Sequence, residues 1–154
     1  MELNFELLKN EIEIELNKTN VMVLATSLDN KVTARSISIV NNGLEILFQT
    51  DKRFLKYEQI SKNSLVALSI NNIQIEGIAK SLGHPMNDKN LLFQKIYKGK
   101  HEGSFEMYSK LENEVVILVN PLLITLWKYI DNKPCRDFLL CNENRAIREF
   151  YDPK

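Results

Sequence analysis

Residues 32–50, VTARSISIVNNGLEILFQT, hold two apolar segments on either side of an Asn-Gly turn. Asn-Gly between two such segments is the strongest short-range signal for a β-hairpin, because both residues tolerate the positive φ of a tight turn. We therefore expect strands over 32–40 and 44–50, in a meander with the short apolar strand Val21–Thr26. Successive strands joined by tight turns favour an antiparallel barrel over a parallel sheet.

Basic residues gather directly after this hairpin. The second strand ends at Thr50 and is followed by Asp51-Lys52-Arg53-Phe54-Leu55-Lys56, where a short helix over 54–62 is expected to begin. Arg35 on the first strand and Lys56 on this helix are predicted to face one another. A phosphate group suits such a pocket, because a dianion leaves water only for several charge-assisted hydrogen bonds. Arg35 taken alone would indicate a solvated cation or a guard on a sheet edge.

At these residues the chain resembles the pyridoxamine 5'-phosphate oxidase-like family of flavin mononucleotide (FMN)-binding split barrels. The resemblance is good over about residues 7–82 and looser towards the end of the chain. It implies a mainly β fold with flanking helices, a six- to seven-stranded antiparallel split β-barrel, in one domain over residues 1–154. It also implies a homodimer with FMN at the seam between the subunits.

The resemblance assigns the cofactor-binding residues. The family's strand arginine, strand-ending hydroxyl and helix lysine hold the flavin phosphate, and these roles fall on Arg35, Thr50 and Lys56. The family often has a second basic residue just before that lysine. Leu55 stands there in this chain, so Arg53 or Lys52 is expected to substitute.

The flavin ring is expected beside the same strands. Backbone groups of Ser36, Ile37 and Ser38 would border it, and Gln49 would lie near its pyrimidine edge, while Phe48 is expected in the core. Asn72 stands where the family often has a glutamine, with Gln74 as a nearby substitute. Trp127 either packs in the core or covers the flavin of the partner subunit. No residue is assigned a catalytic role or a metal.

Composition limits the alternatives. The chain has 154 residues, and its 20 basic and 20 acidic residues balance. No overall charge favours nucleic acid or an anionic membrane, and no apolar run is long enough to span one. The acidic N-terminus is unlike a signal peptide, so we expect a cytoplasmic protein. Cys135 and Cys141 lack metal-site spacing and are expected to be bystander thiols.

The remaining elements follow from periodicity and turn residues. Asn4 is expected to cap a helix that buries Phe5, Leu8, Ile12 and Leu16. Strands are expected at 64–70 and 73–80, with a bulge or a close backbone approach at Gly77. A helix through 91–96 and an irregular segment 97–110 with one short helix come next. Strands are expected at 115–119, at 122–130 after an interruption at Pro121, and near 138–140, before a final helix over 144–150.

The leading functional hypothesis is an FMN-dependent oxidoreductase resembling a flavin reductase, with hydride passing between NAD(P)H or a small organic substrate and the flavin. The family's own oxidase activity is disfavoured, because those enzymes close with a Trp/Arg segment and this chain ends EFYDPK. The alternative is a non-catalytic flavin- or haem-binding module, with His84 or His101 as the haem ligand. The third hypothesis is a structural or interaction domain that binds no coloured cofactor.

Overall fold

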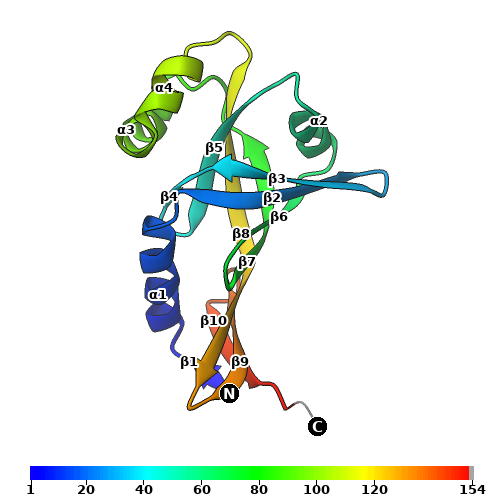
Figure 1. The fold of residues 1–154 in the computed structure, drawn as a ribbon, viewed down its shortest axis with the longest axis vertical. Coiled ribbons are helices and arrows are strands. Elements are labelled where there is room, and N and C mark those ends of the chain that lie inside the picture. The colour runs from blue at the N-terminus through cyan, green and yellow to red at the C-terminus, as the bar shows by residue number, and fades with distance from the viewer. Residues whose placement is uncertain (153–154) are drawn as a thin grey trace.

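The computed structural model describes residues 1–152, which form an antiparallel sheet flanked by helices (Figure 1). The helices are α1 (Phe5–Asn17), α2 (Leu55–Lys62), η1 (Asp88–Asn90), α3 (Leu91–Lys100) and α4 (Glu102–Tyr108). The strands are β1 (Glu2–Leu3), β2 (Val21–Leu28), β3 (Lys31–Ser38), β4 (Val40–Asn42), β5 (Glu45–Asp51), β6 (Leu65–Ile70), β7 (Ile73–Ser81), β8 (Glu114–Ile130), β9 (Lys133–Leu140) and β10 (Arg145–Phe150). None of the helices within residues 1–152 is long and apolar enough to cross a membrane.

The sheet is long, and it does not close. Its order is β1-β10-β9-β8-β7-β6-β2-β3, and β5 pairs with the first half of β8 and with β4. The predicted antiparallel split barrel with flanking helices is confirmed. The sheet has ten strands within residues 1–152, and β9, β10 and β1 lie beyond the barrel, so β2 to β8 make up the barrel, in agreement with the six to seven strands expected.

The expected meander was wrong in one pairing, that between the strand at 32–40 and the strand at 44–50. The Asn-Gly hairpin forms, with Gly43 at φ 61°, but it joins β5 to the three-residue strand β4. The chain leaves β3 at Ser38, and within residues 1–152 the only strand that pairs with β3 is β2. The edges of β3 and β5 therefore diverge, and this divergence is the split in the barrel.

Strand β8 is continuous through Pro121, where an interruption was expected. Proline has no N–H for the ladder, and here it lies opposite Gly77, at the point where the register of β7 shifts. A Cβ on Gly77 would lie 2.6 Å from the carbonyl oxygen of Asn120, so the predicted close approach at this glycine is confirmed.

The prediction of a C-terminal helix over 144–150 was wrong. Residues 145–150 form β10, which pairs with β9 along its whole length, and β9 itself is longer than expected. The pairing with β9 explains this, because the burial of β10 does not by itself alternate: only Ala146 of the six residues is buried. Asn144 ends the β9–β10 turn at φ 51°.

The second half of β8, with β9, β10 and β1, extends below the barrel as a stem (Figure 1). Asp137 is fully buried in it and accepts two hydrogen bonds from Arg148, at 2.6 and 2.7 Å. Lys128 Nζ lies 2.9 Å from Asp137 and 2.6 Å from Glu11, so the network ties α1 to the stem. Burial alone would raise the pKa of Asp137, but the hydrogen bonds from Arg148 and Lys128 outweigh it and lower that pKa.

The core has two parts, which explains why β8 and the centre of β5, Ile46 to Phe48, are apolar on both faces. One side of each strand packs inside the barrel, where Phe48 is fully buried as expected, together with Leu8, Ile12 and Leu16 of α1. The other side packs against α3 and α4, through residues such as Leu47, Val116 and Phe105. Strands covered on both faces need no polar alternation. The Asn4 cap of α1 forms, its side chain accepting from the N–H of Leu7 at 3.0 Å.

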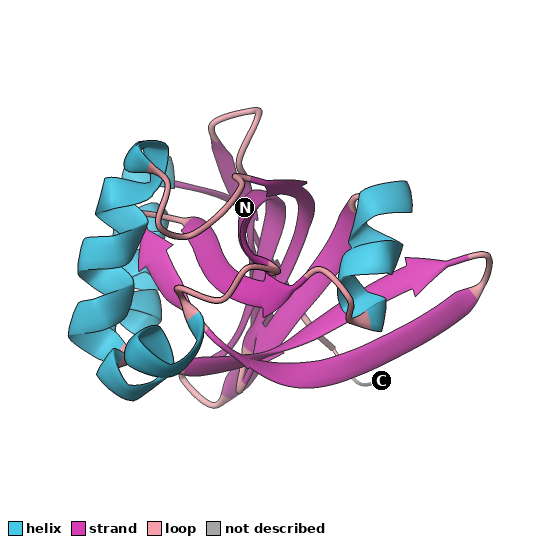
Figure 2. Ribbon diagram, turned by 90° about the horizontal axis from the view of Figure 1, so that it is seen from above, coloured by secondary structure: helices cyan, strands magenta, loops and turns pink. Residues whose placement is uncertain are grey.

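Seen from above, α1, α3 and α4 lie on one side of the sheet and α2 on the other (Figure 2). The inner face of β2, β3, β6 and β7 carries buried residues such as Met22, Leu24 and Ile75. Their outer face is the set of residues that alternate with these, including Val21, Val23, Leu65 and Ile78, each 40–59% exposed. No helix within residues 1–152 covers this outer face (Figure 2).

Candidate functional site

A cavity of about 470 Å³ lies at the split of the barrel. Its walls come from the free edge of β3, the end of β5, the start of α2 and the helices α3 and α4. We call it the split cavity, and it is lined by Ser36, Ile37, Ser38, Gln49, Thr50, Asp51, Arg53, Phe54, Lys56, Tyr97, Ser104, Tyr108, Leu111 and Glu114. Its volume falls within the range of small-molecule sites.

The cavity wall on β3 is a strand edge without a partner strand within residues 1–152. Ser36, Ile37 and Ser38 line the cavity along this edge, so backbone groups are available to a ligand there. Opposite them, the Gln49 side chain is fixed by the hydroxyl of Ser109, which donates to its Oε1 at 2.7 Å.

Thr50 is an unusual residue of the wall. It is 4% exposed, and its hydroxyl oxygen is buried without a hydrogen-bond partner in the described chain. An unsatisfied buried hydroxyl costs about 1–3 kcal/mol, so such groups are expected to have a partner that the protein itself does not supply. The orphan hydroxyl therefore marks a place for a polar ligand.

Two cations, Lys56 and Arg35, lie close enough to repel each other, and Lys56 shares the cavity wall with Thr50. Lys56 lines the cavity; burial lowers the pKa of its ammonium, and repulsion from Arg35 lowers that pKa further. Burial also lowers the pKa of Arg35. Within residues 1–152 neither cation forms an ion pair: Lys56 lies 5.1 Å from the Phe54 ring centroid, and Arg35 donates only to neutral oxygens. The Glu114 carboxyl acts on Lys56 in the opposite direction but forms no ion pair with it, so two half-buried cations still make this corner attractive to a phosphate.

Arg53 differs from these two. Its guanidinium pairs with both carboxylate oxygens of Asp51, at 3.0 and 2.7 Å, and its backbone N–H donates to the same carboxylate. The hydrogen bond from Arg53 is the largest cause that lowers the pKa of Asp51 to about 2. Arg53 lines the cavity, but Asp51 already balances its charge.

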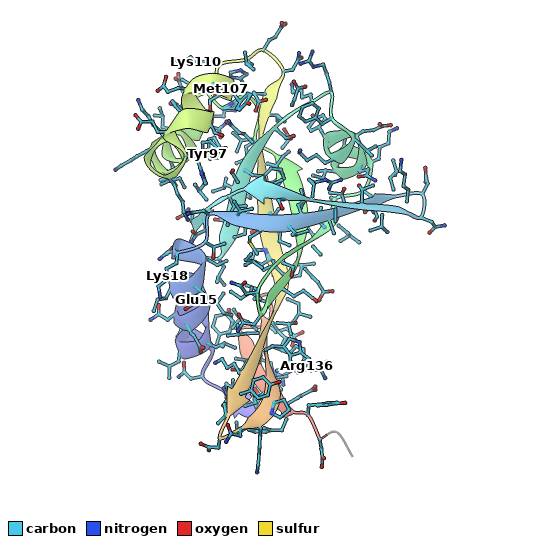
Figure 3. All side chains as sticks on the ribbon, in the orientation of Figure 1. Glu15, Lys18, Tyr97, Met107, Lys110 and Arg136 are labelled. Carbon is cyan, nitrogen blue, oxygen red and sulfur yellow. The ribbon has the colours of Figure 1, made fainter. Side chains whose placement is uncertain are left out.

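The structure thus brings together seven of the ten predicted cofactor residues in the split cavity: Ser36, Ile37, Ser38, Gln49, Thr50, Arg53 and Lys56. Arg35 does not line the cavity, although its charge acts on Lys56, which does. Asn72 and Trp127 lie elsewhere, bonded to each other through Asn72 Nδ2 and the Trp127 carbonyl at 2.8 Å. Arg136, 5.4 Å from the Trp127 ring, is low on the stem, whereas Tyr97 marks the helical wall above (Figure 3).

The sequence analysis missed the opposite wall, made by Tyr97, Ser104, Tyr108, Leu111 and Glu114. Tyr97, Ser104 and Tyr108 lie in the segment 97–110, which was expected to be irregular with one short helix. It holds the end of α3, which runs past the expected residue 96, and α4, because Phe93, Tyr97 and Phe105 pack on β5 and β8. Leu111 and Glu114 follow that segment, and Glu114 begins β8. Glu114 is 6% exposed. Burial, and then repulsion from Asp51, raises the pKa of its carboxyl, while Lys56 and His84 act in the other direction.

No protein-family model matches the sequence, and no curated protein does either. Solved structures do match the fold. A pyridoxamine 5'-phosphate oxidase-related, FMN-binding protein from Nostoc punctiforme PCC 73102 aligns over 99% of this chain and 100% of its own, with a TM-score of 0.63 and 15% identity. The chain has the fold of the pyridoxamine 5'-phosphate oxidase-like split barrels.

Other split barrels match equally well. General stress protein 26 from Bacillus anthracis str. Sterne is 20% identical, with a TM-score of 0.61 over 76% of this chain and 91% of its own. The haem storage protein HutZ from Vibrio cholerae is 11% identical, with a TM-score of 0.63 over 74% of this chain and 89% of its own. One fold thus holds FMN-binding and haem-storing proteins, so the ligand must be argued from the site.

The raised pKa of Glu114 predicts how the stability of the protein depends on pH. Folding raises the pKa of the Glu114 carboxyl, so its ionisation destabilises the folded state. This destabilisation is complete at a pH above the folded-state pKa and is absent at a pH below the unfolded-state pKa. We therefore expect Glu114→Gln to unfold at a higher temperature than the wild type at pH 8, with the difference lost by pH 4. Thermal unfolding at both pH values measures this.

The same substitution should strengthen anion binding at pH 8, because it removes a negative charge beside Lys56. Sulfate is the suitable probe, since its charge stays constant over this pH range. Glu112→Gln, at an exposed position close in sequence, is the matched control. Equal unfolding temperatures of Glu114→Gln and wild type at pH 8 would contradict the prediction.

Proposed function

We propose that the chain binds FMN in the split cavity and serves as an FMN-dependent oxidoreductase of the flavin-reductase kind. The observation that carries the proposal is the anion corner: the orphan hydroxyl of Thr50 and the ammonium of Lys56 share the cavity wall, and neither Lys56 nor the nearby Arg35 forms an ion pair within residues 1–152. A phosphate monoester supplies the missing negative charge and the missing hydrogen-bond partner together.

The residues present fit the rest of the cofactor. Lys56 and Thr50 would hold the phosphate from the cavity, with Arg35 behind them, and the free edge of β3 would border the flat ring. When bound, FMN supplies hydride acceptance and donation at its ring. The protein's part is to bind and orient: backbone groups of residues 36–38 and the fixed Gln49 amide present directed polar groups along one wall. Arg53 would join the phosphate only by leaving Asp51.

The proposal includes a homodimer. Ser36 is exposed on the outer face of β3, beside the apolar residues of β2, so the cavity borders the uncovered outer face. Exposed valine, leucine and isoleucine on one continuous sheet surface are typical of an interface. A second copy on this face would cover the open side of the cavity, and its Trp127 is the residue proposed to lie over the ring. NAD(P)H or a small organic molecule would then be the electron donor.

Haem is the less suitable ligand for the histidines of this chain. His84 accepts from the N–H of Met86 at Nδ1, and its Nε2 lies 2.8 Å from the carbonyl oxygen of Leu111, so both ring nitrogens are engaged. His101 Nε2 lies 2.7 Å from the carbonyl oxygen of Ile39 and joins the α3–α4 corner to the sheet. Either histidine would have to abandon a structural contact to ligate iron.

The first test is the visible spectrum of protein titrated with FMN and with haem, followed by FMN affinities of variants. Wild type should bind FMN, and Lys56→Ala and Arg35→Ala should each weaken that affinity by about 1.5–3 kcal/mol, the range for hydrogen bonds to charged groups. Lys62→Ala, at the far end of α2, is the matched control and should bind as the wild type does. Bleaching of bound flavin by NADH or NADPH would support the reductase.

A haem Soret band without FMN binding would contradict the cofactor assignment. Unchanged FMN affinity in both Lys56→Ala and Arg35→Ala would contradict the site. Bound flavin that no nicotinamide reduces would favour the non-catalytic flavin module.

The dimer has its own test. Val23→Lys places a charge on the apolar outer face and should convert a dimer into a monomer, with a loss of FMN affinity of tenfold or more, on the order of 1.4 kcal/mol. Ile14→Lys, an equally exposed aliphatic position on α1, should change neither. Analytical ultracentrifugation with FMN titration measures both, and a wild type that sediments as a monomer at all concentrations would overturn the homodimer.

A further inference from the structure

Gln59 is a buried amide on α2, one turn after Lys56. It is 1% exposed, and its Oε1 accepts two hydrogen bonds, from Thr26 Oγ1 at 2.5 Å and from Thr33 Oγ1 at 2.8 Å. Its Nε2 donates to the carbonyl of Lys31 at 3.3 Å. The amide therefore joins α2 to the inner face of both β2 and β3.

The same two hydroxyls hold Arg35. Its Nη1 donates to Thr26 Oγ1 at 2.8 Å and to the carbonyl of Leu24 at 3.2 Å, and its Nη2 donates to Thr33 Oγ1 at 2.5 Å. A hydroxyl has one proton. Because each threonine gives that proton to Gln59, its lone pairs remain for the guanidinium, and the direction of every hydrogen bond is set.

This arrangement leaves part of the guanidinium available. Arginine has five N–H donors, and within residues 1–152 three of them are used, so two remain, the Nε donor among them. All three acceptors are neutral. The side chain is thus fixed in place while its positive charge stays uncompensated, next to Lys56 on the helix that carries Gln59.

We propose that Gln59 is a positioning residue of the anion corner. Gln59 fixes the hydroxyls of Thr26 and Thr33, and these hydroxyls in turn hold the Nη1 and Nη2 atoms of Arg35. The remaining donors and the positive charge of Arg35 are then left for a phosphate that Lys56 also binds. The inference rests on the proposed function, because it assigns Gln59 a part in the same phosphate site. It also explains why α2 buries an amide where an aliphatic side chain would avoid the cost of desolvation.

The test is a double-mutant cycle between Gln59→Met and Arg35→Ala, with FMN affinity as the readout. Gln59→Met keeps the side-chain length and removes the acceptor, and it should weaken FMN binding about tenfold, within the range for hydrogen bonds to a charged group. In the Arg35→Ala background the same substitution should cost almost nothing, because the residue it acts through is gone. Gln94→Met, at a part-buried amide on α3, is the matched control.

Gln59→Glu adds a second signature. The new carboxylate can still accept hydrogen bonds from both hydroxyls, but its negative charge offsets that of Arg35. Compared with wild type at the same pH, the variant should bind FMN more weakly at pH 8. The difference should shrink at lower pH, as the carboxyl becomes protonated. Thermal unfolding checks that every variant is folded. If Gln59→Met does not fold, Thr26→Val, which removes one of the two hydroxyls, takes its place in the cycle.

The outcomes separate the two proposals. Wild type that binds neither FMN nor sulfate overturns the proposed function and this inference with it. Wild type that binds FMN while Gln59→Met binds it equally well overturns the inference alone. Equal losses from Gln59→Met with and without Arg35 would also overturn it, because they would show a general structural effect.

Discussion

Repulsion between Arg35 and Lys56 is the constraint on which the site depends. Two cations that are both partly withdrawn from water and that form no ion pair within residues 1–152 raise the energy of the folded chain. Burial and then repulsion from Arg35 lower the pKa of Lys56, against the opposing effect of the Glu114 carboxyl. The buried hydroxyl of Thr50 adds a second unsatisfied demand in the same corner. A single phosphate group relieves both, so the features that make this corner costly in the free protein are those that favour an anionic ligand.

The corner exists because the sheet splits. Strand β3 pairs with β2 and then turns away, so that its other edge, residues 36–38, borders a cavity and the end of β5 forms the opposite wall. Helix α2 follows β5 directly and brings Lys56 and Gln59 to the site, while α3 and α4 close the far side. The outer face of the same strands is left uncovered, and a partner chain on it would lie against the cavity mouth.

Much of this could be predicted from local sequence. The Asn-Gly hairpin, the Asn4 cap, the buried strands and the bulge at Gly77 each have a short-range chemical signal. Seven of the ten residues that the resemblance assigned to the cofactor line one cavity, and their role in binding stays a prediction. The errors concern non-local pairing. Residues 144–150 were interpreted as a charged helix. They form a strand because they pair with β9, a partner that local sequence does not reveal. The extension of α3 to Lys100, Glu114 in the wall and the burial of Gln59 depend on tertiary packing, which periodicity does not encode.

The most direct measurement is a crystal structure of the protein with FMN bound. The account predicts the phosphate in the split cavity, within hydrogen-bond distance of Lys56 Nζ, Thr50 Oγ1 and the Nε donor of Arg35, with the threonine contacts of Arg35 retained. A phosphate bound away from Thr50 and Lys56, or a cavity left empty at saturating FMN, would contradict it.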